Sequence, residues 1–180
     1  IIRKFMKSNN RTWHQLFKFC LGIVIGSAFC MKWMESDFIQ NGKIFTIIGL
    51  EISYSKAKVI EILSSLDEKV KTILGYHLYF DFIFMAGIFP GIASLCMIAR
   101  KKHSGRMLRN LLLVLAFTQI IAWIFDIFEN IYLLNWLKNP VIGNEFGLYH
   151  LLVTLKWIIA LSGFLMAIIF IFKNSRKTIF

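Results

Sequence analysis

Charged residues are scarce in this 180-residue chain, and acidic residues are scarcer than basic ones. Only 17% of the residues are charged and 57% are hydrophobic, whereas soluble domains are about 25% charged. This composition excludes an ordinary soluble globular enzyme and a disordered tail. The 10 Asp and Glu residues face 21 Lys and Arg residues, for a formal net charge of +11. A chain that is both hydrophobic and basic is typical of a multi-spanning membrane protein whose positive charge lies on one side.

Motifs of several large enzyme classes are also missing. The sequence has no P-loop, no GxGxxG, no HExxH and no GxSxG, so phosphate-loop, dinucleotide-binding, zinc-protease and serine-hydrolase chemistry have no support. Cys20, Cys30 and Cys96 form no CxxC pair, which disfavours thiol-oxidising membrane enzymes and predicts free buried thiols. We therefore predict no cofactor and no metal, and we assign no catalytic residue.

Four stretches of the sequence are apolar enough to form membrane-spanning helices. A span needs about 17–25 mostly apolar residues, and uncharged runs occupy residues 19–31, 82–99, 110–125 and 157–172. With the flanking turns added, we predict one transmembrane domain over residues 1–180, with spans at about 13–34, 76–99, 111–137 and 148–172. Backbone groups in lipid must pair within the protein, and no alternating β-barrel pattern is present. We therefore expect an all-α integral membrane four-helix bundle.

The first span has a second interpretation, as the apolar core of a signal peptide. Its uncharged run is short, it follows a basic start, and Gly26-Ser27-Ala28 has the small residues of a cleavage site. Lys18 and Lys32 flank the run, however, and their long side chains can reach opposite headgroup layers. We favour a retained helix.

The distribution of charge predicts the orientation of the bundle. The segment up to Lys18, the connector 100–109 and the tail after Phe172 carry five, five and three Lys or Arg residues and no acid. The opposite side carries seven basic and seven acidic residues. The positive-inside rule then places both termini and the connector in the cytoplasm. These basic segments suit anionic lipid headgroups and are too short to predict nucleic-acid binding, while Trp33 and Trp136 are expected to anchor the membrane interface.

Residues 35–75 form the only long segment between predicted spans, and the segment is too short for a core of its own. Asn41-Gly42 indicates a turn, and the β-branched residues of 43–48 favour an extended segment. From Ser55 we predict one amphipathic helix that lies on the outer membrane surface or caps the bundle, and that turns at Gly75 into the second span. Its apolar residues recur at helical spacing: Ala57, Ile60, Leu63, Leu66, Val70 and Ile73.

Five polar residues inside the predicted spans are the strongest functional signal. They are named the polar cluster here: Asp81, Asp126, Glu129, Asn130 and Lys156. All fall at similar depth in the outer half of the bilayer at about 1.5 Å per helical residue, and the three on the third span share one helix face. A charged group in lipid costs at least about 2.5–3.5 kcal/mol. The cluster is therefore expected to converge inside the bundle, with Lys156 between acids.

Neighbouring residues extend the candidate site. His77 shares a helix face with Asp81, and His150 lies near the outer end of the fourth span, where the two histidines could meet. Gly22 and Gly26 form a GxxxG that is expected to pack inside the bundle. A further group is expected to kink the second span beside Asp81: Gly87, Pro90 and Gly91.

These residues also carry a family resemblance. Over about residues 48–157 the chain resembles a group of uncharacterised bacterial four-span membrane proteins, with Asp81-Phe82 on the second span, DxxEN at residues 126–130 on the third and Lys156-Trp157 on the fourth. A short outer helix at 55–66 precedes the second span in the same way. The resemblance implies a bacterial inner (plasma) membrane location and no particular activity.

The polar cluster allows several functions. It could be an ion-pair network that sets helix register, or the floor of a pocket for a lipid or small ligand. It could also move ions or protons, or act as an acid/base pair on a membrane-soluble substrate. We expect a non-enzymatic ligand-binding or accessory protein that contacts membrane lipids and either forms a homo-oligomer or joins other membrane subunits. The alternatives are an intramembrane enzyme acting on a lipid-like substrate and a small channel or effector subunit.

Overall fold

Four long helices make up most of the protein. The computed structural model describes residues 10–40 and 42–175. The cytoplasmic placement predicted for the basic residues at positions 3, 4, 7, 176 and 177 therefore lies outside the described part. The long helices are α2 (Asn10–Met34), α4 (Glu68–Lys102), α5 (Arg106–Lys138) and α6 (Glu145–Ser175). Among the described residues each of the four, with the turn that follows α2, is long and apolar enough to cross a membrane. The predicted all-helical architecture with four such helices is confirmed.

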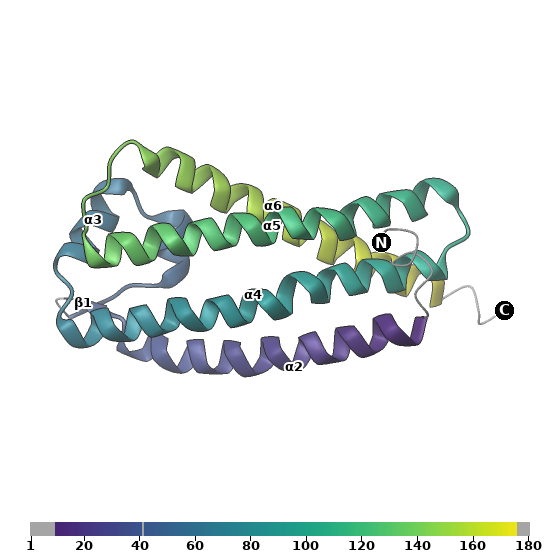
Figure 1. Ribbon diagram of the computed structural model, residues 1–180, viewed down its shortest axis with the longest axis horizontal. Helices are drawn as coiled ribbons and strands as arrows, with labels where there is room; N and C mark the ends of the chain where they lie inside the picture. Colours follow the sequence, from purple (N-terminus) through teal and green to yellow (C-terminus); the bar gives the residue numbers. More distant parts are fainter. Residues whose placement is uncertain (1–9, 41, 176–180) are drawn as a thin grey trace.

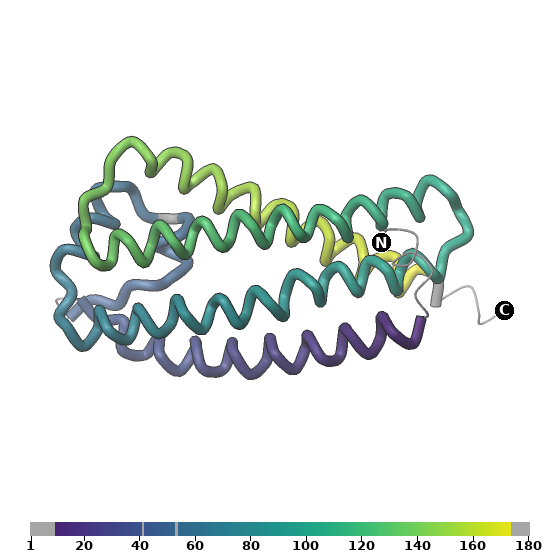
Figure 2. The backbone as a smooth tube through the Cα atoms, in the orientation of Figure 1, coloured from purple at the N-terminus to yellow at the C-terminus, as the bar shows by residue number. Residues whose placement is uncertain are grey.

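The long helices run up and down beside one another (Figures 1 and 2). Helix α2 packs on α4, α4 packs on α5 and α6, and α5 packs on α6. The short elements between α2 and α4 gather at one end of the bundle, named the loop end here. At the opposite end, the connector end, α2 begins, α6 ends, and His103–Gly105 join α4 to α5. The bundle therefore separates the short elements from the most basic connector.

A short hairpin and two tight turns follow α2 at the loop end. The 3-10 turn η1 (Glu35–Asp37) leads into β1 (Ile39–Gln40), which pairs antiparallel with β2 (Lys43–Ile44). Gly42 adopts a left-handed φ of 73°, a conformation that suits glycine in a hairpin turn. The chain becomes helical again before the π-helical turn η2 (Gly49–Ser53). The predicted extended segment 43–48 is thus correct only for Lys43 and Ile44.

The segment after Ser55 contains two helices rather than the one predicted. The first is α3 (Lys56–Ser64), whose N-terminus is capped by Ser55 Oγ, which accepts a bond from the Lys58 amide over 3.3 Å. Asp67 then caps α4 by accepting from the Val70 amide over 2.8 Å. A second N-cap starts a new helix, so the predicted continuous helix and its turn at Gly75 are wrong. Gly75 lies inside α4.

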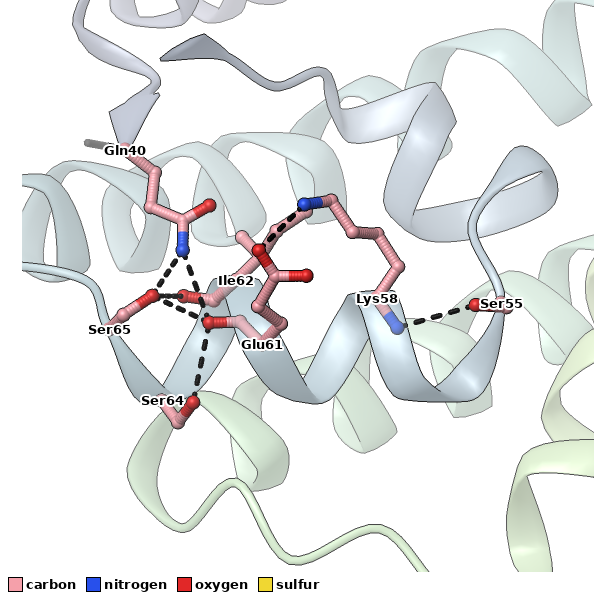
Figure 3. Close-up of polar contacts among 7 residues, drawn as sticks. All are labelled: Gln40, Ser55, Lys58, Glu61, Ile62, Ser64 and Ser65. Carbon is pink, nitrogen blue, oxygen red and sulfur yellow. Dashed lines mark hydrogen bonds and ion pairs between the residues drawn. The ribbon is translucent and has the colours of Figure 1, made fainter. Parts of the chain in front are cut away.

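The hairpin is fastened to the end of α3. The Gln40 side-chain amide donates to the Glu61 carbonyl over 3.1 Å and to the Ser65 hydroxyl, which itself bonds back to the Glu61 carbonyl over 2.5 Å (Figure 3). Two of these bonds satisfy the Glu61 carbonyl, which lies in the last turn of α3, where carbonyl groups lack partners within the helix. They hold the short elements together as one unit.

This unit shares a hydrophobic core with the ends of the long helices. Phe38, Leu50 and Val59 are buried against residues of α4, α5 and α6 in a single apolar cluster. Helix α3 therefore caps the bundle, which is the second of the two placements predicted for it. Trp136 is only 4% exposed and packs on Tyr149 with ring centroids 4.8 Å apart, so its predicted role as an interface anchor is wrong. Trp33, at 72% exposed, is free to play that role.

Gly87 marks a close approach between α2 and α4. A Cβ at Gly87 of α4 would lie 2.9 Å from Val24 Cγ2 and 3.0 Å from the Cys20 carbonyl oxygen of α2. A Cβ at Gly22 or Gly26 would meet nothing within 4 Å. The predicted internal packing of the GxxxG is therefore wrong: both of its glycines face outward, and the close contact is made from the other helix. Helix α4 also runs through Pro90 without ending.

Candidate functional site

Lys156 of α6 lies at the centre of a buried group of acids. Its Nζ is 2.5 Å from Oε2 of Glu129 and 2.9 Å from Oδ1 of Asp126, both on α5. All three side chains are at most 8% exposed. Residues three apart on a helix lie on one face, so a single ammonium group reaches both carboxylates. Ion pairs thereby link α5 to α6 in a region of low polarity.

Asp81 and Asn130 form the second part of the polar cluster. The Asn130 side-chain amide on α5 donates to Oδ2 of Asp81 on α4 over 2.5 Å. Asn130 follows Glu129 directly, and both are buried. Among the described residues, no ion pair includes Asp81. All five members of the polar cluster thus come together from three helices, with α5 contributing to both parts.

Glu51 joins this group, and the sequence analysis missed it. Its Oε2 lies 3.7 Å from Nζ of Lys156, and its side chain is 12% exposed. In the sequence, Glu51 is one of the seven acids that balance the seven basic residues on the side opposite the basic segments. One signal was present: Glu51 is the only charged residue in the run 44–55, and a lone acid among apolar residues is a candidate for burial with a partner.

Backbone bonds hold Glu51 in place. It lies in η2, where the Tyr54 amide donates to the Gly49 carbonyl over 2.8 Å, the spacing of a π-helical turn. The hydroxyl of Tyr149 on α6 donates to the carbonyl of Leu50 over 3.2 Å, and Leu50 is buried. Tyr149 thus fixes η2 to the helix that carries Lys156. π-Helical turns are frequent at functional sites.

The surroundings of Glu51 change its proton affinity. Burial is the largest influence and raises the pKa of the Glu51 carboxyl above its ordinary value. The ammonium group of Lys156 opposes this change, and the nearby Asp126 carboxyl reinforces it. Glu51 therefore holds a proton more readily than an exposed glutamate does.

A cavity of 360 Å³ opens beside these groups. Six charged side chains line it, and four of them belong to the group around Lys156: Glu51, Asp81, Asp126 and Lys156. The rest of its wall is mainly apolar and comes from α2, α4, α6 and the segment just before η2, including Met31, Ile47, Phe84, Ile88, Phe89, Trp157 and Ala160. An ion pair with an N–O distance of 2.7 Å, between Lys32 and Glu35, also borders it. Apolar walls with a few convergent polar groups are typical of small-molecule sites.

His77 and His150 lie apart from the cavity. The His77 side chain is fully buried, with Nε2 3.9 Å from Oε1 of Glu35 and its ring packed on Phe38. His150 packs on Phe146. Neither histidine lines the cavity, and no contact between the two is recorded. Among the described residues, no group of three or more His, Cys, Asp or Glu side chains could hold a metal ion.

The cavity offers hydrogen-bond acceptors, two cations (Lys156 and Lys32), and the Asp81 carboxyl group, which has no cationic partner within the described residues. Comparisons with protein-family models, with curated proteins and with solved structures find no match to this chain. Function must therefore be argued from the cavity and the groups that line it.

Proposed function

We propose that this chain is a multi-pass membrane protein that binds the polar head of a lipid-like amphiphile or small ligand beside the polar cluster. The observation that carries the proposal is the 360 Å³ cavity, which combines the charged floor with apolar walls. Ligand pockets of about 300–1,000 Å³ commonly have this combination. A purely structural ion-pair network would need no such space beside it.

The charge of the site favours a ligand head that is cationic or rich in hydrogen-bond donors. The ammonium group of Lys156 lies among four carboxyl groups, those of Glu51, Asp81, Asp126 and Glu129. Full ionisation would leave a formal charge of −3 in a region of low polarity. A cationic ligand head bound in the cavity would reduce this excess of negative charge. Asp81 is the best-placed contact, because it lines the cavity and no described cation is paired with it.

The proposed location is a bacterial inner membrane, with both termini and the connector 100–109 in the cytoplasm. The charge distribution supports this orientation, because the connector end is basic and the loop end carries acids. The polar cluster then lies toward the outer leaflet. The ligand would enter from that leaflet or from outside the cell.

The second candidate is an intramembrane enzyme on a lipid-like substrate. Asp81 favours it, since a cavity-lining carboxyl without a described cationic partner could act as a general acid or base. Glu129 is less suited to that role, because it pairs with Lys156 and does not line the cavity. The third candidate, a small channel or effector subunit, needs an oligomer and remains a prediction.

Ligand chemistry can be tested with three amphiphiles that share one alkyl chain: a primary amine, an alcohol and a carboxylic acid. We expect the amine to raise the unfolding temperature of the purified full chain most, and the acid least. Asp81→Asn keeps the shape and removes the charge, so it should reduce the preference for the amine. Glu61→Gln, which removes an exposed carboxylate of α3, should leave the preference unchanged.

The outcomes separate the candidates. Equal stabilisation by all three amphiphiles would contradict a charged binding floor. If Asp81→Asn kept amine binding but abolished turnover of a membrane lipid, the enzyme would be the better description. If no amphiphile bound to the parent protein, the cavity would have no ligand of this class.

A further inference from the structure

The connector end carries a second site that is independent of the cavity beside the polar cluster. Three arginines and one asparagine line a separate cavity of 370 Å³: Arg100, Arg106, Arg109 and Asn110. Arg100 comes from the end of α4, and the others come from the start of α5. Three positive guanidinium groups around one cavity repel one another, and an anion between them would offset this repulsion.

Arg100 is unusual because it is a cation that the fold buries. It is only 9% exposed, and its Nε donates to the Arg109 carbonyl over 3.0 Å. Among the described residues, this is the only hydrogen bond recorded for its guanidinium, and the group still lines the cavity. A buried charge is costly without a partner of opposite sign.

No side chain of this chain can be that partner. All ten Asp and Glu residues lie between Glu35 and Glu145, and the acids nearest to the arginines along their own helices are Asp81 and Asp126. These are 19 residues from Arg100 and 17 from Arg109, or about 25–30 Å along a helix at about 1.5 Å per residue. Charges farther apart than about 8–10 Å are largely screened. Within residues 10–40 and 42–175, no acidic side chain lies close enough to compensate the arginines.

The geometry selects the kind of anion. Guanidinium groups bind phosphate oxygens in pairs of parallel hydrogen bonds. The first backbone amides of α5 follow Gly105, which contributes no side-chain cap, and such amides favour negative charge. Asn110 adds a side-chain amide. We propose that Arg100, Arg106 and Arg109 form a binding site for a phosphate group, carried by a lipid headgroup or by free phosphate.

An apolar ridge beside the site suits a lipid as the carrier. Met107, Leu111 and Val114 follow on one face of α5 and are 89%, 41% and 58% exposed. Their spacing of four and three residues places them in one line along the helix. An acyl chain could lie on this ridge while its phosphate meets the arginines.

The test measures affinity of the purified full chain in detergent and phosphate-free buffer. The probes are dihexanoyl phosphatidic acid, inorganic phosphate, and dihexanoylglycerol, which lacks the phosphate. We expect phosphatidic acid to bind and dihexanoylglycerol to bind at least tenfold more weakly. If inorganic phosphate competes with phosphatidic acid but binds more weakly than phosphatidic acid does, the ligand is a lipid headgroup. Equal affinities for phosphate and phosphatidic acid indicate free phosphate as the ligand, and also support the site.

Variants separate a phosphate site from general attraction to a basic surface. Arg106→Gln and Arg109→Gln should each weaken phosphatidic acid binding about tenfold or more, the scale of a lost charge-assisted hydrogen bond. Arg109→Lys keeps the charge and loses the paired bonds, so it should also weaken binding. Lys173→Gln removes an exposed charge of α6 that does not line the cavity and should change affinity less than twofold.

Two results would overturn the proposal. One is the absence of binding by both phosphatidic acid and phosphate to the folded parent protein. The other is an equal loss in Lys173→Gln and Arg109→Gln, because this would mean that only the overall charge matters. Arg100→Gln could unfold the chain, so the exposed Arg106 and Arg109 carry the test. Asp81→Asn alters the first cavity and should bind phosphatidic acid at the arginine site as tightly as the parent does. This result would show that the two sites are independent.

Discussion

Nζ of Lys156 lies 3.7 Å from Oε2 of Glu51, and this ion pair joins the last long helix to a turn outside the membrane-spanning helices. The same ammonium group contacts Glu129 and Asp126 of α5. One lysine thus connects η2, α5 and α6. Glu51, Asp126 and Lys156 also line the cavity, so we expect Lys156 to affect both the stability of the bundle and the shape of the cavity.

Replacing Lys156 should destabilise the protein strongly. Lys156→Met leaves buried carboxyl groups without their cation, and breaking a buried pair from one side typically costs about 3–5 kcal/mol. The measurement is the free energy of unfolding in detergent, followed by tryptophan fluorescence. Lys58→Met removes an exposed pair with Glu61 on α3 and should change little. Similar losses in both variants would mean that the buried ion pairs do not stabilise the bundle.

Stability should also depend on the protonation of Glu51. Burial raises its pKa from the ordinary value of 4.5, so the folded state holds the proton more tightly than the unfolded state. The resulting stabilisation is complete below 4.5 and is lost as pH rises through the raised value. Asp126 and Glu129 of α5 and Lys156 of α6 face the same group and contribute their own pH dependence.

Glu51→Gln imitates the protonated carboxyl and isolates the contribution of Glu51 to the pH dependence of stability. As pH rises above the ordinary value of 4.5 and through the raised pKa of Glu51, the variant should lose less stability than the parent, and above that pKa it should be the more stable of the two. Unfolding temperatures across this range provide the measurement. Glu61→Gln on the exposed face of α3 serves as the control and should keep the slope of the parent. A slope that Glu51→Gln leaves unchanged would show that this carboxyl does not titrate in the folded protein.

Two glycine substitutions should act in opposite directions. Gly87→Ala places a Cβ 2.9 Å from Val24 Cγ2 and 3.0 Å from the Cys20 carbonyl oxygen, and such overpacking costs about 1–3 kcal/mol. Gly22→Ala meets nothing within 4 Å and gains about 0.5–1 kcal/mol of helix propensity. Unfolding free energies of the two variants provide the comparison. A destabilised Gly22→Ala would indicate that the outer face of α2 contacts another molecule closely.

The orientation can be tested by labelling. Ser104 lies in the connector between α4 and α5, and Val141, at 74% exposed, lies between α5 and α6 at the loop end. Single cysteines at these positions, in a chain whose three native cysteines are replaced by alanine, should differ in intact cells. A membrane-impermeant maleimide should label Val141→Cys and should not label Ser104→Cys until the cells are opened. The reverse pattern would place the termini outside.

The long helices and much of the polar cluster could be predicted from the sequence, because lipid imposes simple rules. Uncharged runs separated by basic connectors leave few alternatives to four helices. Charges within those runs must turn inward, and the spacing of Asp126, Glu129 and Asn130 places them on one face. The meeting of Lys156 with two of these residues follows from the high cost of a charge in lipid.

The loop end could not be predicted as well, because there local preferences compete with tertiary contacts. The apolar spacing after Ser55 suggested one helix, but the Asp67 cap begins a new one. Glu51 resembled an ordinary loop acid in the sequence, and its contact with Lys156 from within η2 depends on the tertiary fold. Trp136 resembled a membrane anchor in the sequence, but it is buried against Tyr132 of α5 and against Phe146 and Tyr149 of α6.

The position of Lys156 in chain order bears on biosynthesis. Glu51, Asp81, Asp126 and Glu129 are all synthesised before it, and Lys156 is the only cation recorded in contact with Glu51, Asp126 or Glu129 among the described residues. A nascent chain that ends before α6 therefore holds carboxyl groups in or beside the bilayer with no internal cation. Docking of α6 supplies that charge last, so quality-control proteases could distinguish an incomplete bundle from a finished one by its exposed acids.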